Sequence, residues 1–147
     1  MFAKIADTVA MNRLALTLSL AFASVLSAQD NDAPKDFRFD SSGIGFAGIE
    51  QLAELRGKPV LVDLWGINCG PCIGAAVPMS VKEQAELGED IQVIFVEAQG
   101  HSLAEVEKFA LQRGWLGGRA MWTTQRPFPT QGQGIPHAAL LDVEGRL

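Results

Sequence analysis

Cysteine and histidine are scarce in this sequence of 147 residues, which holds two of each. The cysteines, Cys69 and Cys72, are separated only by Gly-Pro, and the histidines are His101 and His137. A structural zinc site needs four ligands, usually spaced as C-x2-4-C with H-x3-5-H, and these positions do not fit that spacing. We therefore expect no metal site, and nothing in the sequence indicates another cofactor.

An excess of basic side chains is also missing. The net charge is -5 at pH 7, and an acidic protein repels phosphate backbones, so we expect no nucleic-acid partner. With 48% hydrophobic and 20% charged residues, the composition is that of a soluble globular protein. The length allows one compact domain, and we find no internal repeat.

A hydrophobic run of the usual membrane-spanning length is absent too. Residues 11–28, MNRLALTLSLAFASVLSA, place Arg13 before a shorter apolar run that ends in small residues. This is typical of a secretory signal peptide, so we expect residues 1–28 to be removed and the protein to be exported, to the periplasm or another extracytoplasmic compartment. The alternatives are an uncleaved anchor, which would bring membrane contact, and a buried helix. Because Asp7 suits a signal poorly, Met11 is a second candidate start.

The rest of the sequence alternates between patterns typical of strands and of helices. Residues 29–47 are polar and rich in Asp, Ser and Gly, which indicates a linker with at most one edge strand, leading into a domain over 48–147. The spacing of apolar residues then predicts, in order, a short helix at 48–56, a strand at 60–65, a helix at 70–87, a strand at 91–96, a helix at 102–113, a long connection at 115–134 and a strand at 138–143.

This order predicts an α/β fold. Strands joined through helices form parallel sheets with helices on their faces, and the strand at 138–143 is expected to join antiparallel. Pro78 predicts a kink in the helix at 70–87, and Ser102 with Glu105 forms a capping box. Residues 144–146 have the composition of a hairpin turn.

The two cysteines lie where the strand at 60–65 gives way to the helix at 70–87. The unpaired amides of a helix N-terminus stabilise a thiolate, so Cys69 is expected to be the nucleophile. Cys72, one turn later, could close a disulfide with it. The pair is therefore a candidate redox centre; an inert disulfide is the alternative, although so small a loop would stabilise the fold little.

Two segments carry a resemblance to a known family. KPVLVDLWGINCGPC and GIPHAALLDVEGRL resemble the thioredoxin superfamily, and the signal peptide with the V-D-L-W and L-L-D-x-E-G-R phrases is similar to its exported TlpA/ResA-like branch. The resemblance covers residues 57–147. It implies a three-layer α/β fold with a central mixed sheet, from which this chain would lack the last strand and the C-terminal helix.

The resemblance also implies roles for single residues. Cys69 would attack, Cys72 would resolve, Asp63 would be a buried carboxylate beneath them, and Pro136 would be a cis-proline facing the disulfide. A carboxylate in an apolar strand is costly, and a raised pKa would let Asp63 exchange a proton with Cys72. A purely structural, hydrogen-bonded aspartate is the alternative.

Three further residues are candidates for substrate contact or tuning. A cis bond would turn the backbone of Ile135 toward a substrate strand, whereas a trans proline would merely begin a strand. Asn68 stands where thioredoxins carry Trp, which leaves substrate choice open. His137 could tune the thiolate or be an ordinary loop residue, and His101 is expected to be a surface residue beside a helix.

Two functional classes follow. The first is an enzyme, a thiol-disulfide oxidoreductase that exchanges disulfides with exported proteins in the reductive direction and is served by an upstream redox partner. The second is an interaction or scaffold domain without turnover. Trp115, Trp122 and Phe128 in the long connection either form a substrate-facing rim or anchor the loop. The sequence does not indicate an oligomeric state.

Overall fold

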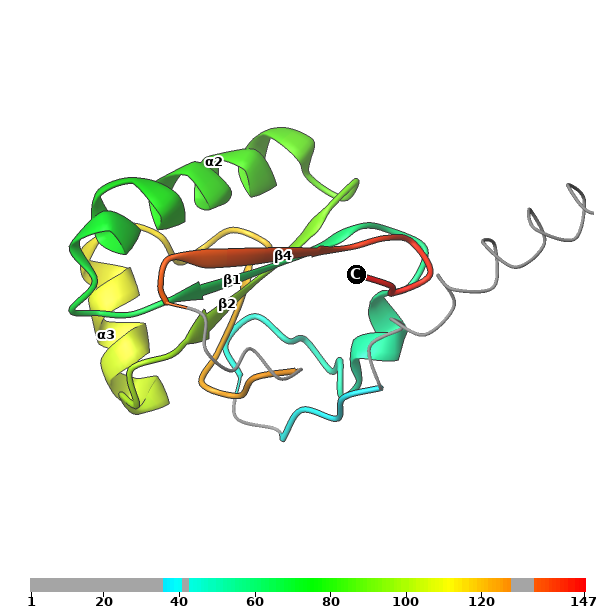
Figure 1. Ribbon diagram of the computed structural model, residues 1–147, viewed down its shortest axis with the longest axis horizontal. Helices are drawn as coiled ribbons and strands as arrows, with labels where there is room; N and C mark the ends of the chain where they lie inside the picture. Colours follow the sequence, from blue (N-terminus) through cyan, green and yellow to red (C-terminus); the bar gives the residue numbers. More distant parts are fainter. Residues whose placement is uncertain (1–35, 41–42, 128–133) are drawn as a thin grey trace, which may run out of the picture. The chain divides into compact units, whose positions relative to one another are not determined.

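The computed structural model describes residues 36–40, 43–127 and 134–147, which fall within one compact unit, Pro34–Leu147. The elements are η1 (Leu52–Leu55), β1 (Val60–Trp65), η2 (Cys72–Ala76), α2 (Val77–Leu87), β2 (Gln92–Glu97), α3 (Leu103–Gln112), β3 (Met121–Thr123) and β4 (His137–Leu141) (Figure 1). Within these residues, no helix has the length and apolar character needed to cross a membrane. The predicted signal peptide lies outside the described residues.

The centre of the unit is a mixed sheet in the order β3-β2-β1-β4. β1 pairs parallel with β2, β2 pairs parallel with β3, and β4 joins β1 antiparallel. β1 and β2 are almost continuously apolar because elements cover both of their faces. The predicted α/β class, the parallel centre and the antiparallel joining of the last strand are confirmed.

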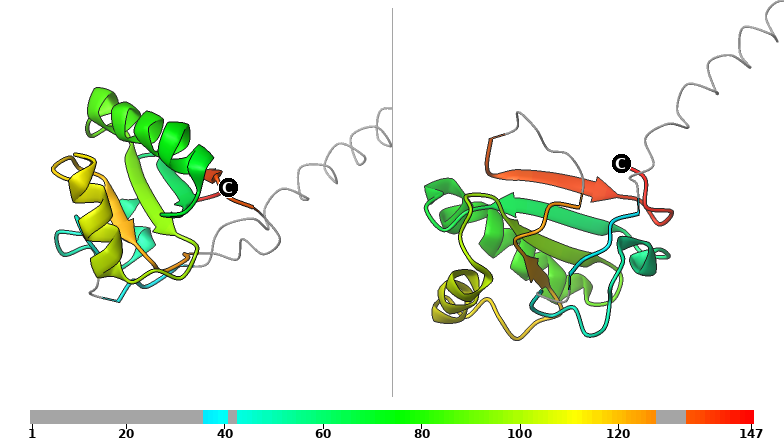
Figure 2. Two further views of the ribbon diagram at one scale, coloured as in Figure 1. Left: turned by 90° about the vertical axis from the view of Figure 1, so that its left-hand side faces the viewer. Right: turned by 90° about the horizontal axis from the view of Figure 1, so that it is seen from below.

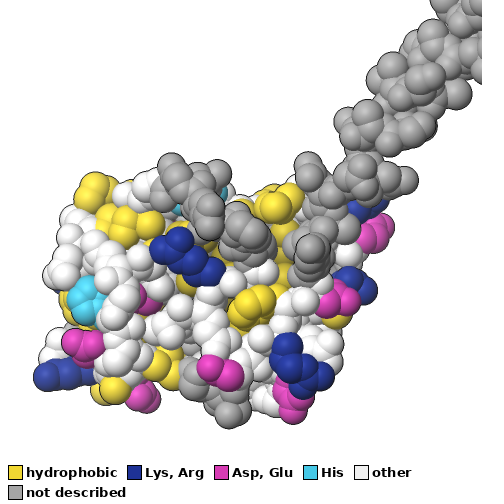
Figure 3. Space-filling view, turned by 60° about the horizontal axis from the view of Figure 1, so that its bottom comes forward, with side chains coloured by type: hydrophobic (Ala, Val, Ile, Leu, Met, Phe, Trp, Pro, Cys, Tyr) yellow, Lys and Arg dark blue, Asp and Glu magenta, His cyan; other side chains and the backbone are white. Residues whose placement is uncertain are grey.

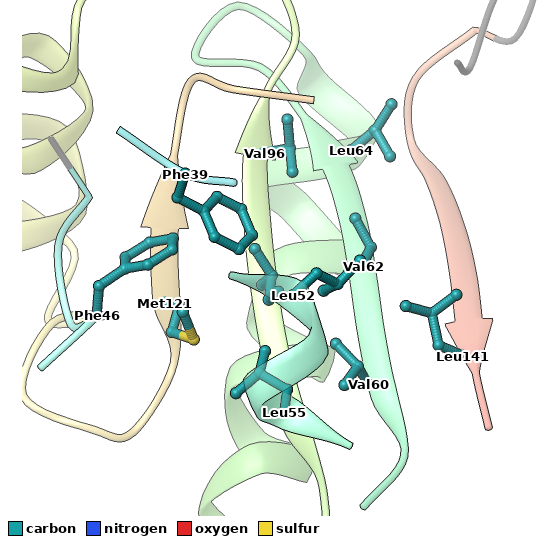
Figure 4. Packing of buried hydrophobic residues seen from close by; sticks show 11 residues of the cluster. Phe39, Phe46, Leu52, Leu55, Val60, Val62, Leu64, Val96, Met121 and Leu141 are labelled. Atoms are coloured by element: carbon teal, nitrogen blue, oxygen red, sulfur yellow. The ribbon is translucent and has the colours of Figure 1, made fainter. Parts of the chain in front are cut away.

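The two faces of the sheet are covered differently (Figure 2). α2 and α3 lie on one face, over a cluster that includes Trp65, both cysteines, Val77, Phe95 and Val106; we call this the helix-side cluster. Residues 37–40 and 43–55 lie on the other face. Their apolar side chains, from Phe39, Phe46, Leu52 and Leu55, point toward those of Val60, Val62 and Met121 (Figure 4). Each buried aromatic or aliphatic side chain contributes about 1.5–3 kcal/mol.

The N-terminal segment differs from the sequence prediction. Phe39 and Phe46, both within the predicted linker, are 4% and 8% exposed. The Phe39 amide donates to the Glu50 carbonyl at 2.8 Å, and Ile44 exchanges two backbone hydrogen bonds with Trp122 at 2.9 Å each. The described part of the predicted linker is therefore packed against the domain.

The helix predicted over 48–56 was wrong in length. Only one 3-10 turn, η1, forms there, with Leu52 and Leu55 buried. The two leucines are three residues apart, the spacing at which side chains of a 3-10 helix share a side. One such turn is enough to bury both.

The ion pairs of this segment are exposed. Arg38 contacts Glu50 at 2.6 Å and Arg56 contacts Asp36 at 2.7 Å, and each side chain is more than half exposed. On the face shown in Figure 3, basic side chains mostly lie beside acidic ones. Exposed pairs contribute about 0–1 kcal/mol each, so burial of the phenylalanines holds the segment in place.

The long connection predicted over 115–134 contains a strand that the sequence prediction missed. β3 has only three residues, too few to show a period, and its middle residue Trp122 is 1% exposed. Trp115 stacks on Trp122 with ring centroids 6.3 Å apart, and both rings lie against Trp65. These tryptophans anchor the connection, as the second interpretation predicted. Phe128 lies outside the described residues.

The helix after the cysteines begins with a wide turn. In η2 the Val77 amide donates to the Cys72 carbonyl, five residues back, and Pro78 then lies in the first turn of α2. Proline has no N–H to give, so it fits at this position. The kink predicted at Pro78 is thus a widened turn just before it. α3 begins with the predicted capping box of Ser102 and Glu105, and the predicted turn at 144–146 is confirmed by Gly145 N–H donating to Asp142 at 3.0 Å.

Candidate active site at the Cys69–Cys72 disulfide

Cys69 and Cys72 form a disulfide just after β1, with their Cα atoms 5.2 Å apart. Cys69 is 7% exposed and Cys72 is fully buried. The Cys72 amide donates to Sγ of Cys69 at 3.2 Å, and the Ile73 amide donates to the Cys69 carbonyl at 3.0 Å. The two sulfurs therefore differ: Cys69 is the more accessible one and receives a hydrogen bond from the first helical turn.

Pro136 lies at the edge of the same site. The Ile135–Pro136 peptide bond is cis, as the resemblance implied. β4 starts at the next residue, His137, which pairs in register with Leu64 near the end of β1. Ile135 packs against the helix-side cluster that holds both cysteines. The sheet thus brings residues 135–137 beside the strand that leads into the disulfide.

Asp63 is the buried carboxylate of β1, at 2% exposed. The Ser80 hydroxyl on α2 donates to its Oδ2 at 2.8 Å. Burial raises the pKa of Asp63 above its usual value, the hydrogen bond from Ser80 opposes that rise, and nearby Glu83 adds to it while His137 opposes it. The direction that the sequence predicted is confirmed: the carboxyl group holds a proton more readily than an ordinary aspartate.

A groove of about 520 Å³ opens beside Asp63, between α2 and β4. Its lining includes Pro71 from between the cysteines, Met79 and Ser80 on α2, and Pro136 with His137. Most of this surface is apolar. The groove extends from Pro71, between the two cysteines, to the buried carboxylate of Asp63. His137, which is half-buried, is one of its polar groups.

The structure contains a second buried carboxylate, which the sequence prediction missed. Glu97 ends β2 and its side chain has no exposed surface. The amides of Gln99, Gly100 and His101 donate to it at 2.9–3.0 Å, and Nδ1 of His101 lies 2.9 Å from its Oε1. The expectation that His101 is a surface residue was wrong, because its side chain is 22% exposed and bound to Glu97.

This second cluster reaches the residue before the first cysteine. Nε2 of His101 lies 3.3 Å from Nδ2 of the Asn68 side chain, and the backbone amide of Asn68 donates to Oε1 of Gln99 at 2.8 Å. The Gln99 side chain can reach Asn68 because Gly66 has no Cβ; a Cβ there would collide with it. A signal for this cluster exists in the sequence, since Glu97 is an acidic residue at the end of an apolar strand.

The structure therefore gathers the predicted site residues around one point. Cys69, Cys72 and Asn68 come from the junction after β1, Asp63 from β1 itself, and residues 135–137 from the start of β4. Their roles in exchange stay predictions. Glu97 and His101, from the end of β2 and the loop after it, complete the surroundings of Asn68.

No family model matches the chain. Solved structures do. A thioredoxin-like superfamily protein superposes with a TM-score of 0.64 at 19% identity, covering 78% of this chain and 81% of that one. A thiol-disulfide isomerase from Corynebacterium glutamicum gives a TM-score of 0.63 at 21% identity, with 80% and 83% covered. This chain has a thioredoxin-like fold.

Two further comparisons agree with this fold. A Chlorobium tepidum protein described as a candidate thiol:disulfide interchange protein DsbE gives a TM-score of 0.61 at 24% identity, covering 78% of this chain and 79% of that one. Chloroplastic thioredoxin Y from Oryza sativa subsp. japonica is 35% identical over 57 residues, which span 39% of this chain and 33% of that protein. This chain thus combines a thioredoxin-like fold with a cysteine pair that is joined as a disulfide.

Proposed function

We propose that this protein is a thioredoxin-like thiol-disulfide oxidoreductase that reduces disulfides of exported proteins through Cys69 and Cys72. The observation that carries the proposal is the difference between the two sulfurs, because only Cys69 combines some exposure with an amide hydrogen bond to sulfur. Such a bond favours a thiolate. The names of proteins with the same fold, an isomerase and a candidate interchange protein, give additional support.

The proposed reaction has two exchange steps. The Cys69 thiolate attacks one sulfur of a substrate disulfide; the substrate S–S bond breaks, and the departing sulfur leaves as a thiolate that takes up a proton. Cys72 then loses its proton and attacks Sγ of Cys69, which releases the second substrate sulfur as a thiolate. Two electrons pass to the substrate, and the protein is left with the Cys69–Cys72 disulfide.

Asp63 is the proposed proton acceptor for Cys72. Its burial raises its pKa, so the carboxylate is a stronger base than an exposed aspartate. The groove beside it would connect the carboxyl group to solvent between turnovers.

The same groove is the proposed place for substrate. Its apolar lining suits an apolar side chain of an extended polypeptide, and Pro136, the residue after Ile135, lies at the end nearest the start of β4. In the proposal the Ile135 backbone pairs with the substrate strand, and Asn68 contacts it on the opposite side of the disulfide. No metal or other cofactor takes part.

The direction of exchange indicates the redox partner, and the sequence indicates the location. Each turnover leaves an oxidised pair, so an upstream dithiol must reduce it again. The predicted signal peptide and the similarity of the quoted segments to the TlpA/ResA-like branch support export to the periplasm or another extracytoplasmic compartment. The substrates would be disulfide-containing proteins of that compartment.

The proposal can be tested by trapping the mixed disulfide between the protein and its substrate. Cys72→Ser should accumulate a mixed disulfide between Cys69 and a substrate protein, because no thiol remains to resolve it, and Cys69→Ser should form none. Wild-type protein with dithiothreitol should reduce insulin, and Cys69→Ser should not. Absence of both trapping and turnover would overturn the proposal in favour of the interaction or scaffold domain.

A further inference from the structure

The four hydrogen bonds at Glu97 fix the role of its carboxylate. Oε1 faces the Gln99 amide and Nδ1 of His101, and Oε2 faces the amides of Gly100 and His101. Three of these donors are backbone amides, which cannot act as acceptors. Gly100 has a φ of +89°, a conformation that favours glycine and lets successive amides turn toward one point. The site is therefore built for a group that only accepts.

That arrangement also fixes the tautomer of neutral His101. Nδ1 must carry its proton toward Glu97, and Nε2 then has a lone pair. The group 3.3 Å from Nε2 is Nδ2 of Asn68, which donates. A continuous series of hydrogen bonds thus runs from a fully buried carboxylate to the side chain of the residue before Cys69.

We infer that Glu97 and His101 are positioning residues that orient the side-chain amide of Asn68, the residue before Cys69. We also infer that protonation of His101 turns this amide round, so that its oxygen faces His101 in place of its nitrogen. The inference rests on the proposed function, since it concerns the reactivity of the attacking cysteine. With a proton on Nε2, His101 becomes a donor at both nitrogens, and the Asn68 amide must turn its oxygen toward it.

The charges around His101 set the direction of the effect. Glu97 faces Nδ1, and Glu105 and Lys108 of α3 line the shallow pocket that His101 shares with Ile67. Glu105 is held by Ser102 in the capping box. When His101 is neutral, the Glu97–His101 pair carries a net negative charge; when it is protonated, the pair is neutral. The protonated state should therefore favour the Cys69 thiolate more.

The experiment measures the alkylation rate of Cys69 against pH in the reduced full-length protein, with the modified cysteine identified by peptide mass. NMR of the histidine ring protons shows the pH range over which His101 titrates. In the wild-type protein, the alkylation rate should rise with pH as the Cys69 thiol loses its proton. The rate should also show a second change of about fivefold over the pH range in which His101 gains or loses its proton. His101→Gln should lose the second change. His137→Gln, which removes the other histidine of the sequence, should keep it, whatever its effect on turnover.

Asn68→Ala separates positioning from charge alone. In this variant the NMR signals of His101 should still change with pH, while the second change in Cys69 alkylation becomes clearly smaller, because only the charge of His101 still acts on the thiolate. If that change persists at full size, the charge of His101 acts through space and the proposed role of Asn68 is overturned. If His101→Gln keeps the change while its thermal unfolding shows a folded protein, the role of His101 is overturned.

Insulin turnover measured on the same preparations distinguishes this inference from the proposed function. A two-step profile without turnover overturns the proposed function and leaves the positioning of Asn68 standing. Turnover with a one-step profile in wild-type protein overturns the positioning and leaves the proposed function standing.

Discussion

Asp63 and Glu97 are the buried acidic residues among those that the structure describes, and each is 2% exposed. They lie on neighbouring strands, and each has a histidine nearby. Their partners differ. Asp63 accepts one hydrogen bond from a side chain, that of Ser80, whereas Glu97 accepts from three backbone amides and an imidazole.

Burial alone therefore does not decide what a carboxyl group does. With a single side-chain donor, the cost of burial dominates at Asp63 and its pKa rises, which suits proton exchange. With four donors, Glu97 orders the loop after β2 and holds His101. Glu97 therefore holds a loop in place, whereas Asp63 has the raised pKa that the proposed proton exchange needs.

Removing Glu97 should cost the most. Glu97→Ala leaves three loop amides and the His101 imidazole without their acceptor, so the free energy of unfolding should fall by about 3 kcal/mol, measured by urea denaturation. The matched variant Asp63→Ala removes one acceptor and a poorly solvated charge, and should cost clearly less. Equal losses would contradict the contrast.

Asp63→Asn should slow the second exchange step. The asparagine cannot accept a proton from Cys72, so release of substrate from the mixed disulfide should slow by about 100-fold while the first attack changes little. Rapid quenching with a preformed mixed disulfide measures the release. Glu97→Gln, a change of the same kind at the other buried carboxylate, should leave the release rate within a few-fold of wild type. A similar slowing in both variants would assign no special role to Asp63.

The pH dependence of stability should reveal Asp63 directly. Its pKa is raised in the folded protein, so the folded state binds this proton more tightly than the unfolded state, and stability should fall as pH rises from the usual aspartate range through the folded pKa. Asp63→Asn should remove that fall and be the more stable protein at neutral pH. Ser80→Ala, which removes the larger of the two influences that lower the pKa of Asp63, should extend the fall to higher pH. A fall that survives in Asp63→Asn must come from another group.

Gly66→Ala should have the smallest effect. The added Cβ displaces the Gln99 side chain, so the hydrogen bond that it accepts from the backbone amide of Asn68 is lost. The free energy of unfolding should fall by about 1 kcal/mol. Thermal unfolding measures the loss. Gly70→Ala, where a Cβ meets nothing within 4 Å, serves as the control, and an equal effect there would mean that the contact with Gln99 is unimportant.

Local patterns predicted the sheet and most of the cysteine site. β1 and β2 are unbroken apolar runs, and the cysteines follow β1 directly, so neighbouring residues carried the information. Asp63 stood out because it interrupts such a run. Pro136 was found through the resemblance to thioredoxins, since nothing in the residues around it distinguishes a cis from a trans bond.

The missed features depend on contacts between distant segments. Phe39 and Phe46 are single apolar residues in a polar stretch, and only the uncovered face of the sheet makes them core residues. β3 is too short to show a period. The binding of His101 to Glu97 depends on the path of the loop between them, because their spacing of four residues occurs here outside any helix.

The burial of Phe39 and Phe46 limits where the chain could be processed. If the predicted signal peptide is cleaved after Ala28, the cut leaves both phenylalanines in the mature protein. A protease that trimmed the chain to Gly48, the domain start that composition suggests, would remove both side chains and uncover Val62 and Met121. Any cut beyond Phe37 would therefore expose hydrophobic surface of the core.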